Sequence, residues 1–270
     1  MQQPIFIYTA LPCEAQPLIG HFRLKKDLRV QAFAVFRREN ICLTVTGIGK
    51  SAMAAGIAYT QALFAEPAYP VMLNAGIAGH KYHPLGSVFL ANKITDADSQ
   101  KCHYPPIVFK PPCAATSIQT YAKPQLAYRH DELCDMEASA FYETAARFTT
   151  GELIQALKVV SDNENHSAAQ VTAQAASEML AAHIGVIVQV LGQVDKLSAS
   201  LAVTGPQGLN ELLGRYHFSV NGQQQLKNKL ARWELLGGGP SVFEAMDGVR
   251  DGKGVLKRLE EKIRELEFYL

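Results

Sequence analysis

The sequence has few cysteines, and their arrangement argues against two classes of protein. Its 270 residues include five cysteines, an odd number that is widely scattered and contains no CxxC pair. Zinc sites and disulfide-rich secreted domains need paired or closely spaced cysteines. The pattern is instead typical of a chain in a reducing cytoplasm.

The sequence also lacks a long hydrophobic run and a strong charge of one sign. The formal net charge is +1, which gives no bulk attraction to nucleic acid or to an anionic membrane. No apolar run reaches the length of a transmembrane helix. Pro4 and Pro12 interrupt an N-terminal region that has no basic segment before an apolar core, so a signal peptide is not expected. We therefore predict a soluble, cytoplasmic protein with neither a nucleic-acid nor a membrane partner.

What the sequence does contain is a core of ordinary size and an alternation of strands and helices. Hydrophobic residues make up 48% of the chain, enough for a large α/β domain. A long Ala-rich helix is predicted over residues 167–194. The segments that predict strands are 4–10, 30–36, 41–45, 70–75, 86–91 and 117–121. Such alternation indicates an α/β fold with a mixed, mainly parallel central sheet flanked by helices.

The character of the sequence changes near residue 197. Small and polar residues there predict a linker, and two helices follow within residues 209–236. Residues 255–270 have the apolar stripe of an amphipathic helix. We therefore predict an α/β domain over residues 1–197 and a small helical extension over residues 198–270. The extension packs on the core or on a second subunit, or it docks another protein.

Acidic residues stand at the ends of predicted strands. Asp135 and Glu137 occur where the run LCDME passes into a helix, and Asp162 follows Val159 and Val160. Ligands of open α/β sheets bind beyond the carboxyl ends of the strands. Glu137 and Asp162 therefore indicate an acid-lined pocket. Helix capping is the competing interpretation, because Asp is a good N-cap residue.

Two glycine-rich stretches lie near the same predicted strand ends. The GIGK run at residues 47–50 lacks the GxxxxGK[ST] spacing of a phosphate loop, so we interpret it as a tight turn. Gly76 and Gly79, in GIAGH, predict a turn whose backbone approaches a ligand closely.

Several segments, taken in order, resemble one superfamily. They are ALPCEAQPL, GIGKSAMAA, NAGIAGH, GSVFLANKITDAD, CDMEASAF and KVVSDNEN. They resemble the nucleoside phosphorylases and nucleosidases, most closely the methylthioadenosine/S-adenosylhomocysteine nucleosidases. The resemblance covers roughly residues 4–195. It implies a nucleoside phosphorylase-like fold that hydrolyses the N-glycosidic bond of a purine nucleoside or a 5′-modified one. It also implies a homodimer and a reaction that needs no cofactor or metal.

The resemblance implies roles for individual residues by position. Glu14 resembles the carboxylate that activates water, and Asp162 the acid that protonates the purine N7, with Ser161 orienting it. Breaking the bond leaves negative charge on the base and oxocarbenium character on the ribose, so an acid and a base are both needed. The remaining substrate-binding candidates are Glu137 at the ribose hydroxyls, Met136 against the sugar, and Gly76, Ile77 and Lys158.

The chain also departs from the superfamily pattern. Asn74 and Ile77 stand where phosphorylases have the arginine and the serine that hold phosphate, which favours water as the nucleophile. Lys158 replaces an arginine and loses its fork geometry. The base-stacking aromatic has no clear counterpart, with Ile118 and Tyr121 as candidates. Two alternatives stay open: a phosphate-dependent phosphorylase, and a non-catalytic nucleoside-binding or partner-regulating protein.

Overall fold

The chain folds into two compact units, each with its own core. The computed structural model describes residues 3–64, 69–125, 127, 131–201, 206–237 and 242–267. The units are Met1–Ala202 and Val203–Leu270.

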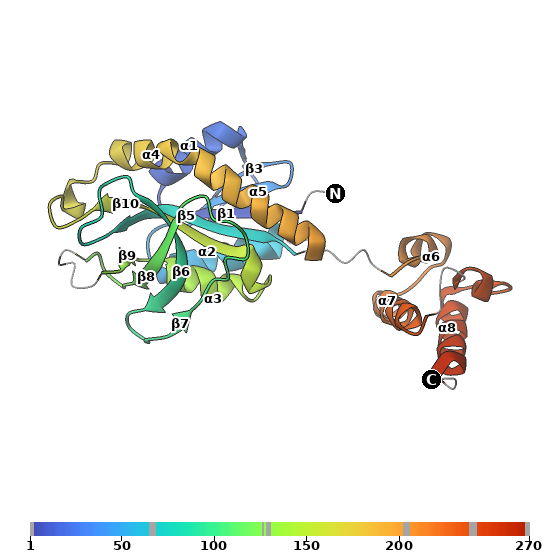
Figure 1. The fold of residues 1–270 in the computed structure, drawn as a ribbon. Coiled ribbons are helices and arrows are strands. Elements are labelled where there is room, and N and C mark those ends of the chain that lie inside the picture. Colours follow the sequence, from blue (N-terminus) through green and yellow to red (C-terminus); the bar gives the residue numbers. More distant parts are fainter. Residues whose placement is uncertain are drawn as a thin grey trace. The chain divides into compact units, whose positions relative to one another are not determined.

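The first unit is built on one sheet, to which its described residues contribute ten strands (Figure 1). Strand β10 pairs with both β5 and β6, so β5, β10, β6, β8 and β9 close on themselves, and the sheet continues from β5 through β1, β4, β3 and β2. The two longest registers, β5 with β10 and β6 with β8, are parallel. The bounds are β1 (Ile5–Thr9), β2 (Lys25–Lys26), β3 (Ala34–Arg38), β4 (Ile41–Val45), β5 (Val71–Gly79), β6 (Val88–Asp96), β7 (Cys102–His103), β8 (Ala114–Thr120), β9 (Leu133–Asp135) and β10 (Ile154–Asp162).

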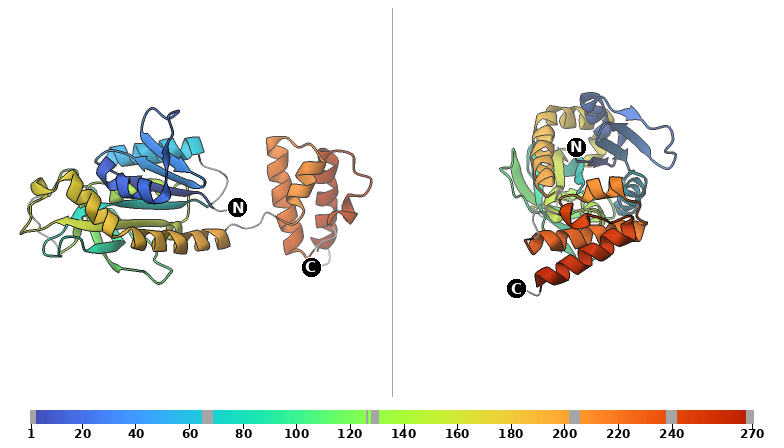
Figure 2. Two further views of the ribbon diagram at one scale, coloured as in Figure 1. Left: turned by 90° about the horizontal axis from the view of Figure 1, so that it is seen from above. Right: turned by 90° about the vertical axis from the view of Figure 1, so that its right-hand side faces the viewer.

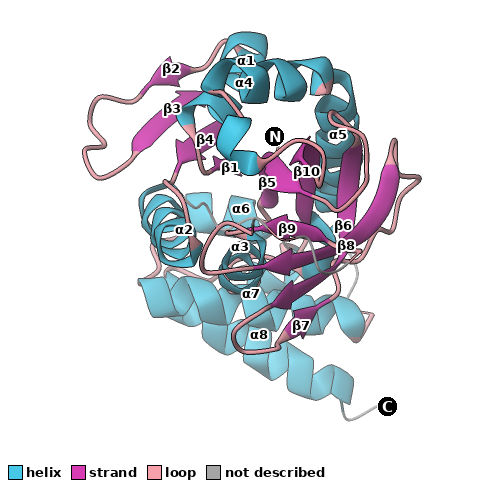
Figure 3. Cartoon of the chain, turned by 90° about the vertical axis from the view of Figure 1, so that its left-hand side faces the viewer, coloured by secondary structure: helices cyan, strands magenta, loops and turns pink. Residues whose placement is uncertain are grey.

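Helices cover both faces of this sheet. Figures 1 and 3 show α1 (Pro12–Phe22), α4 (Ala173–Ala182) and α5 (Ile184–Leu201) on one face, with α2 (Lys50–Phe64) and α3 (Ala138–Ala145) on the other. Short 3-10 turns η1 (Gly151–Leu153) and η2 (Ala168–Gln170) flank β10. Alternate residues of β1 serve the two cores, with Ile5 and Ile7 in one and Phe6 and Tyr8 in the other, as strand geometry requires. The expected mixed, mainly parallel α/β fold is confirmed.

Two strands are longer than their sequence suggested. Strand β5 runs to Gly79, so the predicted glycine-rich turn is part of the strand. Its glycines pair with β10, Gly76 opposite Lys158 and Gly79 opposite Asp162. Strand β6 likewise runs beyond the predicted strand 86–91, to Asp96, through the polar residues 92–96. In both cases pairing with neighbouring strands overrides the local turn propensity.

The long helix predicted over residues 167–194 is two helices. Helix α4 ends before His183, and α5 continues to Leu201, beyond the predicted start of the linker. Burial of Val194 and Ser198 explains the extension. Among the described residues α5 is the one helix long and apolar enough, by length and composition alone, to cross a membrane. Its buried stripe belongs to the core of the sheet, and such core helices commonly have this composition.

The second unit is a small helical bundle. Helices α6 (Leu209–Arg215), α7 (Val220–Leu235) and α8 (Gly252–Glu267) pack together, with the short turn η4 (Glu244–Met246) between the last two (Figure 2). The two helices expected within residues 209–236 and the amphipathic terminal helix are present. Tyr269, which the predicted terminal helix includes, lies outside the described residues. The core consists of Leu212, Phe218, Leu226, Leu230, Trp233, Val242, Met246, Val255, Leu259 and Ile263.

Candidate active site

An acid-lined cavity of about 150 Å³ opens at the carboxyl ends of several strands. Residues at the ends of β5, β9 and β10 line it, together with the start of α1 and the turn before α2. Glu14, Glu137 and Asp162 therefore share one cavity although they are far apart in the sequence. The lining residues are Ala10, Leu11, Glu14, Ile48, Ile77, Ala78, Gly79, Pro124, Gln125, Cys134, Asp135, Met136, Glu137, Ser161, Asp162 and Ala168.

Glu14 is fixed by backbone donors from two elements. Its Oε2 accepts N–H bonds from Ala10 at 2.9 Å and Leu11 at 2.8 Å, which caps the first turn of α1. Its Oε1 accepts the N–H of Ile77, in β5, at 2.9 Å. Burial raises the pKa of Glu14, while Lys158 and the three amides act in the opposite direction. Glu14 is thus both a cap and a buried carboxylate whose raised pKa strengthens it as a base.

Gly76 and Lys158 lie behind the cavity wall and are not among its lining residues. A Cβ built on Gly76 would lie 2.8 Å from Glu14 Oε1 and 3.5 Å from Lys158 Nζ. The glycine therefore makes room for the Glu14 carboxylate, which differs from the close ligand approach that we expected of it.

Lys158 is a buried cation among three acids. Its Nζ lies 2.9 Å from Asp135 Oδ2, and both side chains are almost fully buried. Burial lowers the pKa of Lys158, but Asp135, Glu137 and Glu14 raise it, and the net direction is upward. A buried charge is tolerated only when it is paired. Lys158 thus serves as the shared counterion of the site.

Glu137 reaches the cavity from the residue before α3. Its Oε1 accepts the N–H of Gly49 at 2.7 Å. Burial raises the pKa of Glu137 to about 7; Lys158 opposes this and Asp135 adds to it. One bond leaves the carboxylate with acceptor capacity for a ligand. Met136 lines the cavity beside it.

The structure separates capping acids from the others. Asp135 accepts the Ala138 N–H at 2.8 Å and so caps α3. Asp162 has no such role, because Thr172 caps the next α-helix, α4. Its Oδ1 instead accepts the hydroxyl of Ser161 at 2.5 Å, which orients the carboxyl group. The capping interpretation therefore holds for Asp135, whereas Glu137, although it is the N-cap residue of α3, makes no capping hydrogen bond with its side chain.

Part of the cavity wall was not predicted from the sequence. Pro124 and Gln125 line it, whereas Ile118 is buried in the sheet core and Tyr121 is not among the lining residues. The loop after β8 carries no periodic signal that would have identified them. Within the described residues, no group of three His, Cys, Asp or Glu is placed to hold a metal ion.

A second, apolar cavity of about 720 Å³ adjoins the first. The two share the wall residues Leu11, Ile48, Ile77, Pro124 and Ala168. The second extends along the start of α4, where small side chains leave it wide. Its further lining residues are Pro12, Cys13, Ala169, Val171, Thr172, Ala173 and Ala176.

The raised pKa of Glu137 predicts a pH-dependent stability. The group titrates near 4.5 when unperturbed and near 7 when folded, so between these values the folded state keeps a proton that the unfolded state releases. The free energy of unfolding should therefore fall as the pH rises from 4.5 to 7, by up to about 1.4 kcal/mol per pH unit for one proton. Melting temperatures across this range measure it. Glu137→Gln, which keeps an acceptor for Gly49, should flatten the profile, and an equally steep profile in the variant would contradict the assignment.

Comparison with models of known protein families and with curated proteins finds no match. Solved structures do match. The apo 5′-methylthioadenosine nucleosidase of Arabidopsis thaliana has a TM-score of 0.59 at 18% identity, covering 72% of this chain and 96% of that one. The 5′-methylthioadenosine/S-adenosylhomocysteine nucleosidase of S. pneumoniae, with a transition-state inhibitor, has a TM-score of 0.57 at 19% identity. The match covers 70% of this chain and 98% of that one.

A third example is the corresponding nucleosidase of Colwellia psychrerythraea in complex with adenine, with a TM-score of 0.57 at 15% identity, covering 72% of this chain and 96% of that one. This chain therefore has the nucleosidase fold that its sequence resembles. Identities this low establish the fold alone.

Proposed function

We propose that the protein hydrolyses the N-glycosidic bond of a 5′-modified purine nucleoside. The observation that carries the proposal is the convergence of Glu14, Glu137 and Asp162 on one cavity. The likeness to nucleosidase structures supports it.

In this proposal the three acids divide the work by position. Asp162, oriented by Ser161, protonates the purine ring as the base leaves. Glu137 accepts hydrogen bonds from the ribose hydroxyls. Glu14 takes a proton from water as it attacks the anomeric carbon, and its raised pKa suits that task. Lys158, through its pairing with Asp135, keeps the buried negative charge tolerable.

The charge of the cavity supports water rather than phosphate as the nucleophile. None of the described residues lining it is Lys, Arg or His, whereas four are acidic. A phosphate anion would need charge-assisted donors that this wall lacks. Asn74, which stands at the superfamily's arginine position, is buried and donates its amide to the Tyr8 carbonyl.

The apolar cavity supports a substituent at the 5′ position. It adjoins the site and has an almost wholly apolar wall, so it suits an alkylthio group better than a free hydroxyl. Residues from the start of α4 form its far side.

The test is base release from 5′-methylthioadenosine, S-adenosylhomocysteine, adenosine and inosine, with and without phosphate. We expect phosphate-independent release that yields free ribose or a free 5′-modified ribose. A sugar 1-phosphate product formed only with phosphate would show a phosphorylase. Binding without turnover across the panel would show a non-catalytic nucleoside-binding protein.

A bulky residue in the apolar cavity should change substrate preference. Ala173→Phe fills part of this cavity and should lower kcat/KM for 5′-methylthioadenosine about tenfold relative to adenosine. Gln174→Phe is the matched control, because residue 174 follows it on α4 but is not among the lining residues. Equal losses for both substrates would argue against a 5′ subsite here.

A further inference from the structure

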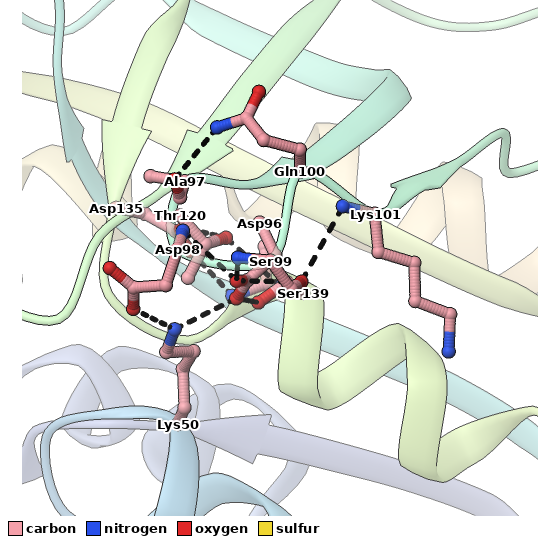
Figure 4. A network of polar contacts seen from close by, with 11 residues as sticks. Lys50, Asp96, Ala97, Asp98, Ser99, Gln100, Lys101, Thr120, Asp135 and Ser139 are labelled. Carbon is pink, nitrogen blue, oxygen red and sulfur yellow. Dashed lines mark hydrogen bonds and ion pairs between the residues drawn. The ribbon is translucent and has the colours of Figure 1, made fainter.

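A buried carboxylate outside the cavity joins three segments near Glu137. Asp96 ends β6 and lies among Lys50 of α2, Ser139 of α3 and the turn at residues 97–100 (Figure 4). Neither Asp96 nor Lys50 lines the acid cavity. This cluster was not predicted, because it lies beyond the end of the predicted strand 86–91.

One oxygen of Asp96 connects two helices. Its Oδ2 accepts Lys50 Nζ at 2.8 Å and Ser139 Oγ at 2.9 Å. Lys50 directly follows Gly49, and Ser139 is two residues after Glu137. Gly49 and Glu137 form a hydrogen bond with each other. Asp96 Oδ2 therefore binds a residue close in sequence to each of them.

The other oxygen of Asp96 is fixed in turn. Its Oδ1 accepts the backbone N–H groups of Asp98 at 3.1 Å and Ser99 at 2.8 Å, together with the Ser99 hydroxyl at 3.0 Å. A carboxylate with five donors has one available orientation. Because the carboxylate is fixed, it can fix the positions of the Lys50 and Ser139 side chains that bind it.

The turn before α2 needs such support. Gly47 and Gly49 both have positive φ, at 90° and 97°. Glycine adopts this conformation readily, but it adopts others as readily, so the glycines alone do not hold the turn in place. Ile48, between them, is 56% exposed and packs little. Gly49 must nevertheless present its N–H at 2.7 Å from Glu137.

We propose that Asp96 is a positioning residue, which through Lys50 and Ser139 holds Gly49 and Glu137 together and so orients the Glu137 carboxylate toward the ribose. The ribose part of this inference rests on the proposed function. The part that concerns Gly49 and Glu137 does not.

A merely structural role for Asp96 predicts a different result from positioning. The groups acting on Glu137 are Lys158 from β10, Asp135 from β9, Glu14 from α1 and the Gly49 amide. The Gly49 bond lowers the pKa of Glu137, so its loss would raise that pKa. Removing the charge of Asp96 acts through space in the opposite direction, because one fewer anion nearby favours ionisation of Glu137.

The experiment is a carbon-13 carboxyl NMR titration of the full-length chain, with Glu137→Gln identifying the Glu137 signal. Asp96→Asn should raise the pKa of Glu137 by about half a unit or more. The one amide oxygen of Asn cannot accept from both the turn at residues 98–99 and the Lys50 and Ser139 side chains, and the neutral side chain no longer pairs with the Lys50 charge. Ser139→Ala, which changes no charge, should shift it in the same direction. Asp98→Asn is the matched control: it removes the exposed partner of Lys50 and should leave Glu137 unchanged.

Kinetics then test the link to the substrate. Asp96→Asn should raise KM for the nucleoside about tenfold with a smaller change in kcat. A Glu137 pKa that falls or stays constant in both Asp96→Asn and Ser139→Ala would overturn the proposal. If the wild type releases no base, the proposed function fails, while the titration still decides whether Asp96 positions Glu137.

Discussion

Glu14→Gln is expected to lower kcat for base release by about 10²–10⁴-fold, the usual contribution of a positioned general base. The amide cannot take a proton from water. The loss should appear with every substrate, because water attacks the sugar whatever the leaving base. Steady-state rates with 5′-methylthioadenosine and with adenosine measure it, and a wild-type rate in the variant would remove Glu14 from the mechanism.

The same substitution should also weaken the fold, and this must be measured separately. Glu14 accepts three backbone N–H groups with two oxygens, whereas Gln has one acceptor oxygen and an NH₂ group. Either the amides at the start of α1 or that of Ile77 would face the NH₂ group. One buried donor without a partner costs about 1–3 kcal/mol. Rates should therefore be compared below the melting transition, where unfolding cannot account for the lost activity.

Asp162→Asn should be comparably severe, at about 10²–10⁴-fold in kcat for purine substrates. The fold should be little affected, because Asn keeps an oxygen that can accept the Ser161 hydroxyl, which lies 2.5 Å from Asp162 Oδ1. What is lost is the proton for the departing base. Purine release under single-turnover conditions measures the chemical step directly.

The leaving group distinguishes the two acids. A riboside whose leaving group departs as a stable anion, such as a nitrophenolate, needs no proton from the enzyme. With it, Asp162→Asn should recover most of the wild-type rate, whereas Glu14→Gln should remain slow. If Asp162→Asn stayed as slow as with purines, its role as the acid would be refuted.

Much of the fold was predictable because its strands are short, apolar and bounded by helix-forming segments. The passage from LCD into α3 was found in this way. The errors came where pairing overrides local chemistry. Gly76 and Gly79 were interpreted as a turn, but both lie in β5, which pairs with β10 as far as Gly79. The break at His183 has no proline to mark it.

The site was partly predictable for a related reason. Acids at strand ends are visible in a sequence, so Glu137 and Asp162 could be named as candidates, and the family resemblance added Glu14. Contacts between distant segments are not visible. The bond from Gly49 to Glu137 spans 88 positions, and no periodic pattern indicates it. Asp96 was missed because its segment has the composition of a turn.

Gly76 shows how the acid-lined cavity constrains a residue that is not among its lining residues. The glycine has no positive φ to explain it, since it lies in the regular strand register opposite Lys158 of β10. A methyl group there would collide with Glu14 Oε1 at 2.8 Å, well inside normal packing distance. In a library of all single substitutions selected for activity, position 76 should therefore be strongly depleted of replacements, alanine included, because the Glu14 carboxylate would have to move away from the Ile77 N–H that holds it.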